Sequence, residues 1–370
     1  MSQFLMKPTL HRLDSVQEFV DNFQITADDV LFINPHLYND YFAPLGLPCA
    51  VVHPKDYGAG EPTDEMIEAI DRDLTGDYKR VIAVGGGSVL DVAKFFVLDQ
   101  TTPVLDLFDG KRTPTKARQL VLIPTTCGTG SEVTSVAALA LVSRGTKAGY
   151  GTPAMFADDA VLIPALLEDL PMGPFSTSAI DALVHAVESA LSPKATPISK
   201  LLSYEAIRLI LRGFKKIAAD GPDARKPIIE DFLFASTYAG VAFSNAGCAA
   251  VHALSYPLGG TFHVPHGESN YAMFTGVMRN YMEIKQDGEI ATLNHTMAEI
   301  LDCDVSDVYD QLEALLNHLV QKKPLHAYGM TEAQIAEFAD SVYEKQQRLL
   351  VNNFVPFDRD RIYKIYKELY

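Results

Sequence analysis

The sequence contains no tryptophan and only four cysteines, Cys49, Cys127, Cys248 and Cys303. The cysteines lie far apart and form no C-x-x-C pair, which argues against a zinc knot or a disulfide framework and fits a reducing cytoplasm. No run of about 18 apolar residues occurs, so no membrane-spanning helix is expected. The N-terminus also lacks the apolar segment of a signal peptide, and we therefore expect a cytoplasmic protein.

Positive charge is scarce as well. The chain has 31 Lys and Arg residues against 47 Asp and Glu residues, which gives a formal net charge of −16. Nucleic acids and anionic membranes bind basic surfaces, so neither is an expected partner. A small anionic molecule remains compatible with this charge, because it needs only a local positive site.

Length and hydrophobic pattern predict two domains. A chain of 370 residues with 48% apolar residues is too long for one typical core. Up to residue 172, short apolar runs at 30–33, 50–53, 81–84 and 120–123 alternate with amphipathic helical patterns, which predicts a mainly parallel sheet with helices. Residues 173–370 show long helical patterns only. The predicted fold is therefore an α/β domain, 1–172, followed by an all-helical domain, 173–370.

Two glycine-rich loops follow predicted strands of the first domain. The first reads Gly85-Gly86-Gly87-Ser88 and precedes a helical pattern, so its backbone can approach a phosphate at a helix N-terminus. An ordinary strand-to-helix turn explains this loop equally well, and its spacing departs from the G-x-G-x-x-G fingerprint. The second loop, Pro124 to Glu132, adds several hydroxyl groups and two further glycines. Together the loops favour a dinucleotide site.

The stretch from Asn245 to Asn270 contains three of the ten histidines. A helix is expected over 246–256, ended by Pro257 and the following glycines, with the chain returning to place His266 near His252. Upstream, Asp181 and His185 are four residues apart and share a helix face. Carboxylate and imidazole groups are plausible metal ligands, although a lone Asp-x-x-x-His pair is more often a surface pair.

These motifs resemble those of the iron-containing (group III) alcohol dehydrogenases. The matching patterns are GGGSxxDxxK, PTTxGTGSE, DAxxHAxE and HAxxxPLGGxxxxPHG, and the likeness runs from the first strand to the last residue. The resemblance implies a dinucleotide-binding first domain and a metal- and substrate-binding second domain. It implies NAD(H) and one divalent metal, Fe(II) by family, although the ligand types equally permit Zn(II).

The resemblance also implies roles for individual residues. The implied metal ligands are Asp181, His185, His252 and His266. The implied catalytic group comprises His266, His252, Tyr256 and His263, with His263 outside the metal's own ligands. The implied cofactor-binding residues are Asn34, Gly86, Gly87, Ser88, Asp91, Thr125, Thr126, Thr129 and Lys147.

The sequence departs from the family pattern at two positions. Tyr256 stands where many members have a further histidine, and Asn34 stands where members that prefer NAD often have Asp. An Asp would repel the 2′-phosphate of NADP, whereas Asn34 retains only the hydrogen bond to the ribose.

HALSYPLGGTFHVPHGESNY and the ending QQRLLVNNFVPF look most like the members that interconvert 4-hydroxybutyrate and succinate semialdehyde with NAD(H). The expected function is therefore hydride transfer between NAD(H) and a short primary alcohol or hydroxy acid, in a homodimer or larger homo-oligomer. Alternatives within the family are a general short-chain alcohol, 1,3-propanediol or lactaldehyde-type dehydrogenase. A dehydroquinate synthase-like lyase would need more Lys and Arg near the metal, and a non-catalytic nucleotide-binding protein would not need every ligand.

Overall fold

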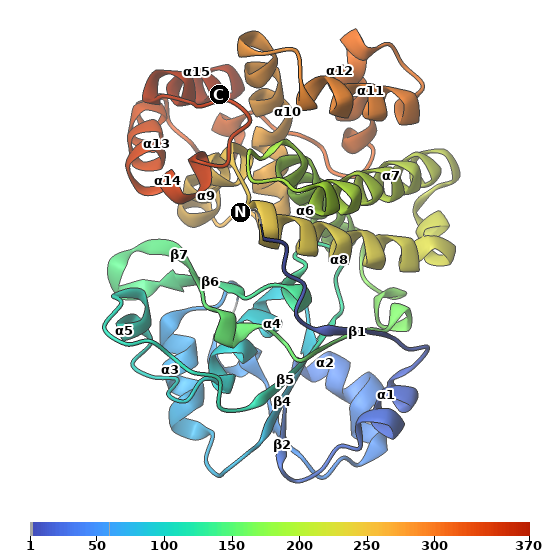
Figure 1. The fold of residues 1–370 in the computed structure, drawn as a ribbon, viewed down its shortest axis with the longest axis vertical. Helices are drawn as coiled ribbons and strands as arrows, with labels where there is room; N and C mark the ends of the chain where they lie inside the picture. The colour runs from blue at the N-terminus through green and yellow to red at the C-terminus, as the bar shows by residue number, and fades with distance from the viewer. Residues whose placement is uncertain (1–2, 59) are drawn as a thin grey trace. The chain divides into compact units, whose positions relative to one another are not determined.

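The computed structural model of the protein describes residues 3–58 and 60–370 (Figure 1). The chain forms two compact units, one comprising Met6–Leu170 and the other Pro171–Tyr370 together with the N-terminal residues up to Leu5. The predicted domain boundary after residue 172 falls at the start of helix α6 (Met172–Leu191).

The first unit is built on a six-stranded parallel sheet with the order β1-β8-β5-β4-β2-β3. Its strands are β1 (Thr9–Arg12), β2 (Asp29–Ile33), β3 (Ala50–Val52), β4 (Arg80–Gly85), β5 (Gln119–Pro124) and β8 (Asp159–Leu162). β2 is buried along its whole length, and β4 and β5 are buried after their first residues. Because β2, β4 and β5 are buried on both faces of the sheet, their sequences are unbroken apolar runs. The prediction of a mainly parallel sheet is confirmed.

Helices and a hairpin complete this unit. The helices are α1 (Val16–Phe23), α2 (Pro35–Leu37), α3 (Asp64–Asp73), α4 (Gly87–Ala93) and α5 (Val104–Phe108). Apolar side chains of α3, α4 and α5 join alternate residues of β2, β4 and β5 in one core. The antiparallel hairpin of β6 (Val136–Leu141) and β7 (Thr146–Gly151), which sequence analysis missed, contributes to the same core.

The strand order places a topological switch at β2 and β4. The chain passes from β2 to β3 on one side, and then returns across β2 to β4 on the other side. Ligands of such sheets bind beyond the carboxyl ends of the strands at this point. The segments after Ile33 and Gly85 therefore occupy the position where a ligand site is expected.

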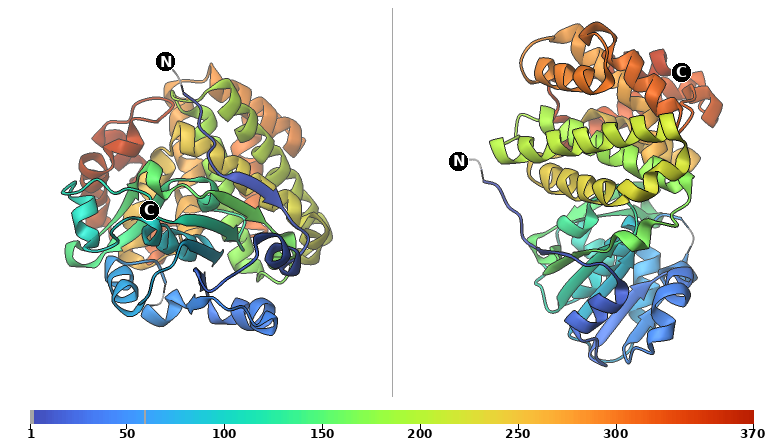
Figure 2. Two further views of the ribbon diagram at one scale, coloured as in Figure 1. Left: turned by 60° about the horizontal axis from the view of Figure 1, so that its bottom comes forward. Right: turned by 90° about the vertical axis from the view of Figure 1, so that its right-hand side faces the viewer.

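The second unit is helical, as predicted. Its helices are α6 (Met172–Leu191), α7 (Pro197–Asp220), α8 (Ile229–Ala246), α9 (Ala250–Phe262), α10 (His266–Ile284), α11 (Glu289–Leu301), α12 (Val308–Asn317), α13 (Glu332–Lys345), α14 (Gln347–Leu350) and α15 (Arg359–Leu369). α6 is central to this unit and packs against α7, α8 and α10, and α9 packs against α10, α13 and α14 (Figures 1 and 2). Fifteen of the twenty residues of α6 are buried.

The prediction for the helix around His252 was wrong at both ends. α9 begins at Ala250 rather than Ala246, and it continues through Pro257 to Phe262. Pro257 removes one backbone hydrogen bond, but helices in proteins owe most of their stability to tertiary packing, and α9 is packed on several sides. His263 then ends the helix in a left-handed conformation with φ 55°.

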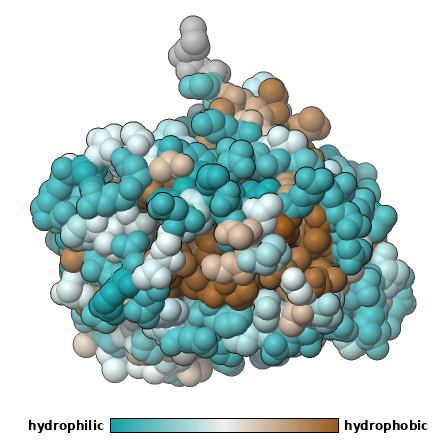
Figure 3. Space-filling view, turned by 90° about the horizontal axis from the view of Figure 1, so that it is seen from below, coloured by the Kyte–Doolittle hydropathy of each residue, from teal (hydrophilic) through white to brown (hydrophobic). Residues whose placement is uncertain are grey.

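One exterior face, shown in Figure 3, is covered mainly by hydrophilic side chains, with a hydrophobic area near its centre and a smaller one at its upper edge. The hydrophilic cover agrees with the acidic composition and is typical of a face in contact with water. Among the described residues, no helix has both the length and the apolar character needed to cross a membrane.

A glycine sets the distance between α6 and α10. A Cβ atom on Gly267 would lie 1.9 Å from the carbonyl oxygen of Thr177, so only glycine allows the two helix backbones to approach this closely. Gly267 directly follows His266, and Thr177 lies one turn before Asp181. The glycine therefore controls how near His266 can come to Asp181.

We expect Gly267→Ala to lower the free energy of unfolding by about 1–3 kcal/mol or more, because the added methyl group overlaps a helix backbone that cannot yield easily. Gly173→Ala is the matched control, since it lies in the first turn of α6 with open space around its Cβ position. The control should be neutral or stabilising by up to about 1 kcal/mol. Thermal and urea unfolding of both variants measure the difference, and equal stabilities would contradict the packing argument.

Candidate metal centre and dinucleotide-binding loops

Four polar side chains from three helices converge inside the second unit. Asp181 and His185 project from α6, His252 from α9, and His266 from the first residue of α10. Asp181 Oδ1 lies 3.6 Å from Nε2 of His252, 3.7 Å from Nε2 of His266 and 4.0 Å from Nε2 of His185. The structure therefore brings the four sequence-predicted ligands together around one carboxylate oxygen.

These separations suit a metal ion. A tetrahedral ion with bonds of about 2.0–2.2 Å holds its ligand atoms about 3.3–3.6 Å apart. The separations from Asp181 to His252 and His266 nearly match this range, whereas His185 would have to move closer. Three imidazoles and one carboxylate are a donor set typical of Fe(II) or Zn(II). Three of the four side chains are buried, whereas His266 is 31% exposed, which leaves an approach for a small molecule.

Asn270 faces the same donor atoms. Its Nδ2 atom donates to Asp181 Oδ1 at 2.7 Å and lies 3.2 Å and 3.3 Å from Nε2 of His252 and His266. Its Oδ1 atom is buried and has no hydrogen-bond partner within the described chain. The amide N–H groups thus lie where a cation would bind, and an incoming cation would displace them or turn the amide so that its oxygen faces the ion. Sequence analysis missed Asn270, although it lies four residues after His266 on the same helix face.

A buried carboxylate fixes the orientation of His252. Glu188 on α6 accepts hydrogen bonds from the backbone N–H groups of Ala249 at 2.9 Å and Val251 at 2.6 Å, and lies 2.6 Å from His252 Nδ1. Because Nδ1 is bonded to Glu188, Nε2 of His252 is directed at Asp181. A carboxylate behind a ligating histidine sets its tautomer and strengthens it as a ligand. Sequence analysis gave Glu188 no role, although it follows His185 by three residues in the same motif.

The charges of this cluster are strongly coupled. Burial disfavours the protonated form of His252, but the carboxylates of Glu188 and Asp181 outweigh burial and raise its pKa to about 9. Burial also disfavours the ionised form of Asp181, yet His185, His266 and His252 outweigh it and hold the pKa of Asp181 below its usual value. Without a metal, a proton on His252 partly neutralises the carboxylates, and a divalent cation would replace it.

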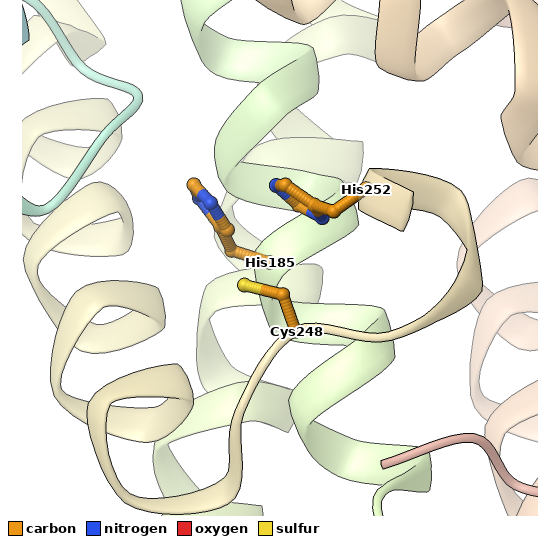
Figure 4. Close-up of side chains that lie close together, drawn as sticks. All are labelled: His185, Cys248 and His252. Carbon is orange, nitrogen blue, oxygen red and sulfur yellow. The ribbon is translucent and has the colours of Figure 1, made fainter. Parts of the chain in front are cut away.

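The ring of His185 stacks on two other aromatic rings, and the thiol of Cys248 lies close by. His185 stacks on Phe243 of α8, with ring centroids 4.2 Å apart, and on His252, with centroids 4.5 Å apart. Cys248 lies beside these two histidines, as Figure 4 shows, and the donor atoms of the three residues lie within 4.8 Å of one another. Burial and the nearby carboxylates raise the pKa of the Cys248 thiol well above its usual value, so it is not poised as a nucleophile.

The other two residues expected to be catalytic differ in position. The Tyr256 ring lies 6.3 Å from the His266 ring, and its hydroxyl is 3.4 Å from Nη2 of Arg348 on α14. His263 is exposed at the end of α9, and within the described residues it makes no hydrogen bond or ring contact with the four converging side chains. The extension of α9 past Pro257 explains this position, because it carries His263 beyond the turn that the sequence suggested.

The first unit contains a cavity of ≈390 Å³ at its topological switch point. Five of the predicted cofactor residues line it: Asn34, Gly86, Gly87, Ser88 and Thr126. Lys55, which sequence analysis did not single out, lines the same cavity. A Cβ atom on Gly86 or Gly87 would lie 3.1 Å from Thr126 Cγ2 or 2.6 Å from Thr129 Cγ2, respectively. Glycine at these two positions therefore lets the two loops touch beside the cavity.

The remaining predicted cofactor residues have partners within the protein. Asp91 accepts hydrogen bonds from Ser131 Oγ at 2.6 Å and from the Ala138 backbone at 2.9 Å. The Thr125 backbone donates to the Gly85 carbonyl at 3.0 Å, which joins the two loops. Lys147 pairs with Glu61 at 2.6 Å. These contacts tie the loops to the hairpin and to the sheet.

Comparison with known proteins identifies the family. Residues 9–164 match the model of the iron-containing alcohol dehydrogenases, and residues 175–370 match the model of the C-terminal part of the Fe-containing alcohol dehydrogenase family. The chain belongs to the iron-containing alcohol dehydrogenase family. It is 47% identical to the 4-hydroxybutyrate dehydrogenase of Clostridium kluyveri, with 100% of both chains covered.

A further relative is named for a different substrate, and a solved structure shares the fold. Long-chain-alcohol dehydrogenase 1 of Geobacillus thermodenitrificans is 34% identical, over 93% of this chain and 88% of its own. The fold matches that of the sulfoacetaldehyde reductase of Bifidobacterium kashiwanohense in complex with NAD⁺, with a TM-score of 0.84, 23% identity, and coverage of 100% and 98%. Family membership therefore places the chain among oxidoreductases and leaves its substrate to be inferred.

We expect Glu188→Gln to weaken binding of a divalent ion about 10- to 100-fold, because the amide places an NH₂ group against a backbone or ring N–H donor and disturbs His252. Competition of the metal-free protein with a chromogenic chelator measures the affinity for Mn²⁺ or Zn²⁺. Glu337→Gln, on the exposed side of α13, is the matched control and should bind as the wild type does. Unchanged affinity in a folded Glu188→Gln protein would contradict the assigned role.

Proposed function

We propose that this member of the family is an NAD-dependent dehydrogenase that interconverts 4-hydroxybutyrate and succinate semialdehyde. The full-length 47% identity to an enzyme of that name supports the substrate. The structural observation that supports the proposal is the exposed Arg348, whose Nη2 lies 3.4 Å from the hydroxyl of Tyr256; the Tyr256 ring lies 6.3 Å from the His266 ring, and Arg348 would provide a cation for a carboxylate.

In this proposal, Asp181, His185, His252 and His266 hold one divalent ion, Fe(II) in keeping with the family. When bound, such an ion supplies a Lewis acid that favours the alkoxide form of an alcohol, or polarises the aldehyde in the reverse direction. The part-exposed side of His266 gives the substrate oxygen its approach. Glu188 orients His252, so this ring needs little rearrangement when an ion binds, whereas the Asn270 amide would have to turn away from the ligand atoms.

Arg348 and Tyr256 would recognise the substrate carboxylate. A carboxylate leaving water needs a cation or several hydrogen-bond donors, and a guanidinium can offer two parallel N–H groups. The backbone of α14 is held in place by Asn352, whose Nδ2 donates to the Cys248 carbonyl at 2.8 Å and to the Arg348 carbonyl at 3.3 Å. These bonds connect the helix that carries Arg348 to the loop that precedes α9.

The cavity of the first unit would bind NAD(H), whose nicotinamide accepts or returns the hydride. Gly86, Gly87 and Ser88 would approach the pyrophosphate, and Asn34 would hydrogen-bond the adenosine ribose. Thr125, Thr126 and Thr129 would line the phosphate and nicotinamide part. Asp91 and Lys147, which already have protein partners, would hold the loops in shape for the cofactor.

The proposed activity predicts a preference for a hydroxy acid. The test is an NADH absorbance assay of the Fe(II)-loaded protein. We expect kcat/KM for 4-hydroxybutyrate to exceed kcat/KM for 1-butanol by a factor on the order of ten to a hundred, because a hydrogen bond to a charged group contributes about 1.5–3 kcal/mol. Equal or higher kcat/KM for 1-butanol or 1,3-propanediol would refute the hydroxy-acid assignment. The enzyme would then be a general short-chain alcohol dehydrogenase.

Arg348→Ala should remove that preference selectively. We expect kcat/KM for 4-hydroxybutyrate to fall on the order of tenfold or more, while kcat/KM for 1-butanol stays within about twofold, because only the acid uses the guanidinium. Arg212→Ala is the matched control, since this arginine is exposed on α7. An equal loss for acid and alcohol would show that Arg348 acts on the site as a whole rather than on the carboxylate.

We expect the residue at position 34 to influence the preference for NAD over NADP. Asn34→Asp should raise the ratio of kcat/KM for NAD over NADP on the order of tenfold, because a carboxylate repels the 2′-phosphate and like charges in a binding site are costly. Asn34→Ala is the control, as it removes the ribose hydrogen bond without adding charge and should change the ratio much less. If Asn34→Asp leaves the ratio unchanged, the residue lies outside the ribose site.

A further inference from the structure

A second set of metal-type ligands overlaps the first. Cys248 Sγ and one nitrogen from each of His185 and His252 lie within 4.8 Å of one another (Figure 4). An ion bonded to two imidazoles and a thiolate holds these atoms about 3.3–3.6 Å apart, so binding requires movements of about 1 Å. Side-chain rotation can supply such movements without changing the helices.

The backbone around Cys248 is held firmly. Gly247 has a left-handed conformation with φ 84°, and a Cβ atom there would lie 2.4 Å from Asn352 Nδ2. The Cys248 carbonyl accepts from that same Nδ2 atom at 2.8 Å, and the next backbone N–H, of Ala249, donates to Glu188 at 2.9 Å. Glu188 also bonds His252, so the thiol and the imidazole are positioned by one carboxylate.

We propose that His185, Cys248 and His252 form a site for a soft divalent ion that competes with the hard-ion site of Asp181, His185, His252 and His266. Thiolate ligands select soft ions such as Cd²⁺ and also suit Zn²⁺, whereas the carboxylate set suits Mn²⁺ and Fe²⁺. The sets compete, because both need the imidazoles of His185 and His252. On binding, the ion forms a bond to sulfur, and the thiol proton passes to solvent.

This competition has a consequence for turnover. An ion held by Cys248 withdraws two of the four proposed ligands from Fe(II), so soft ions should inhibit the enzyme. This last consequence rests on the proposed function, whereas the soft-ion site itself does not. Cys248 would thus make the centre sensitive to the kind of metal available, through the two histidines that both sets share.

Metal titration of the intact metal-free protein tests the site with two probes. Cd²⁺ bound by thiolate gives a sulfur-to-metal charge-transfer absorption, and Mn²⁺ binding is followed by electron paramagnetic resonance. We expect Cys248→Ser to abolish the Cd²⁺ absorption and weaken Cd²⁺ binding at least about tenfold, while leaving Mn²⁺ affinity unchanged. His266→Ala should do the reverse, because His266 belongs only to the hard-ion set.

Controls separate the possible outcomes. Cys303→Ser removes a thiol on a different loop and should keep the Cd²⁺ absorption, and Cys248→Ala gives a second test should the serine variant fold poorly. Absence of the absorption in the wild type, its persistence in both Cys248 variants, or its loss in His266→Ala would overturn the proposal. Mn²⁺ binding that is unaffected by His266→Ala would instead overturn the proposed iron ligands, whatever the Cd²⁺ result.

Discussion

The carboxylate of Glu188 is the interaction on which the candidate metal centre depends. It is buried on α6, and its three bonds reach the start of α9 at Ala249, Val251 and His252. Two of these bonds satisfy backbone N–H groups that have no partner within a helix that starts at this point. The third selects the ring nitrogen of His252 that faces Asp181. The carboxylate of Glu188 thus stabilises the first turn of α9, joins α9 to α6 and orients His252 as a ligand.

Two buried carboxylates so close together require positive charge. Asp181 and Glu188 are 3% and 2% exposed, and an uncompensated charge in the interior is costly. In the metal-free protein His252 provides part of the compensation, since the carboxylates raise its pKa to about 9. One divalent ion with neutral histidines balances both carboxylates completely. The amide nitrogen of Asn270 also donates to Asp181, and this hydrogen bond offsets part of the charge of that carboxylate.

Much of this architecture was predictable from the sequence, because its signals are local. Continuous apolar runs identified four strands of the sheet, and the spacing of Asp181 and His185 gave a shared helix face. The turn after Pro257 indicated that His266 returns near His252, but the meeting of all four ligands could be expected only through the resemblance to a family, since three helices have to meet. The predicted bounds of the helix around His252 were wrong at the C-terminal end because Pro257 was interpreted as the residue that ends it. Tertiary packing stabilises α9 as far as Phe262.

The residues missed by sequence analysis act through contacts distant in the chain. Glu188 accepts a hydrogen bond from the backbone of Ala249, 61 residues away in sequence, and Asn270 donates one to Asp181, 89 residues away. Their places in the chain, in the motif of Asp181 and His185 and one turn after His266, gave a signal, but the partners that define their roles are distant in sequence. Similarly, Asp91 looks like a ligand-facing residue beside a glycine loop, yet it bonds Ser131 and the hairpin that local patterns did not reveal.

The most direct test of the account is the iron K-edge X-ray absorption spectrum of the protein loaded anaerobically with one equivalent of Fe(II). The account predicts an iron ion bonded only to nitrogen and oxygen, with the multiple scattering of three imidazole rings. A sulfur ligand to iron, or a spectrum without imidazole scattering, would contradict the assignment of Asp181, His185, His252 and His266 as the iron ligands.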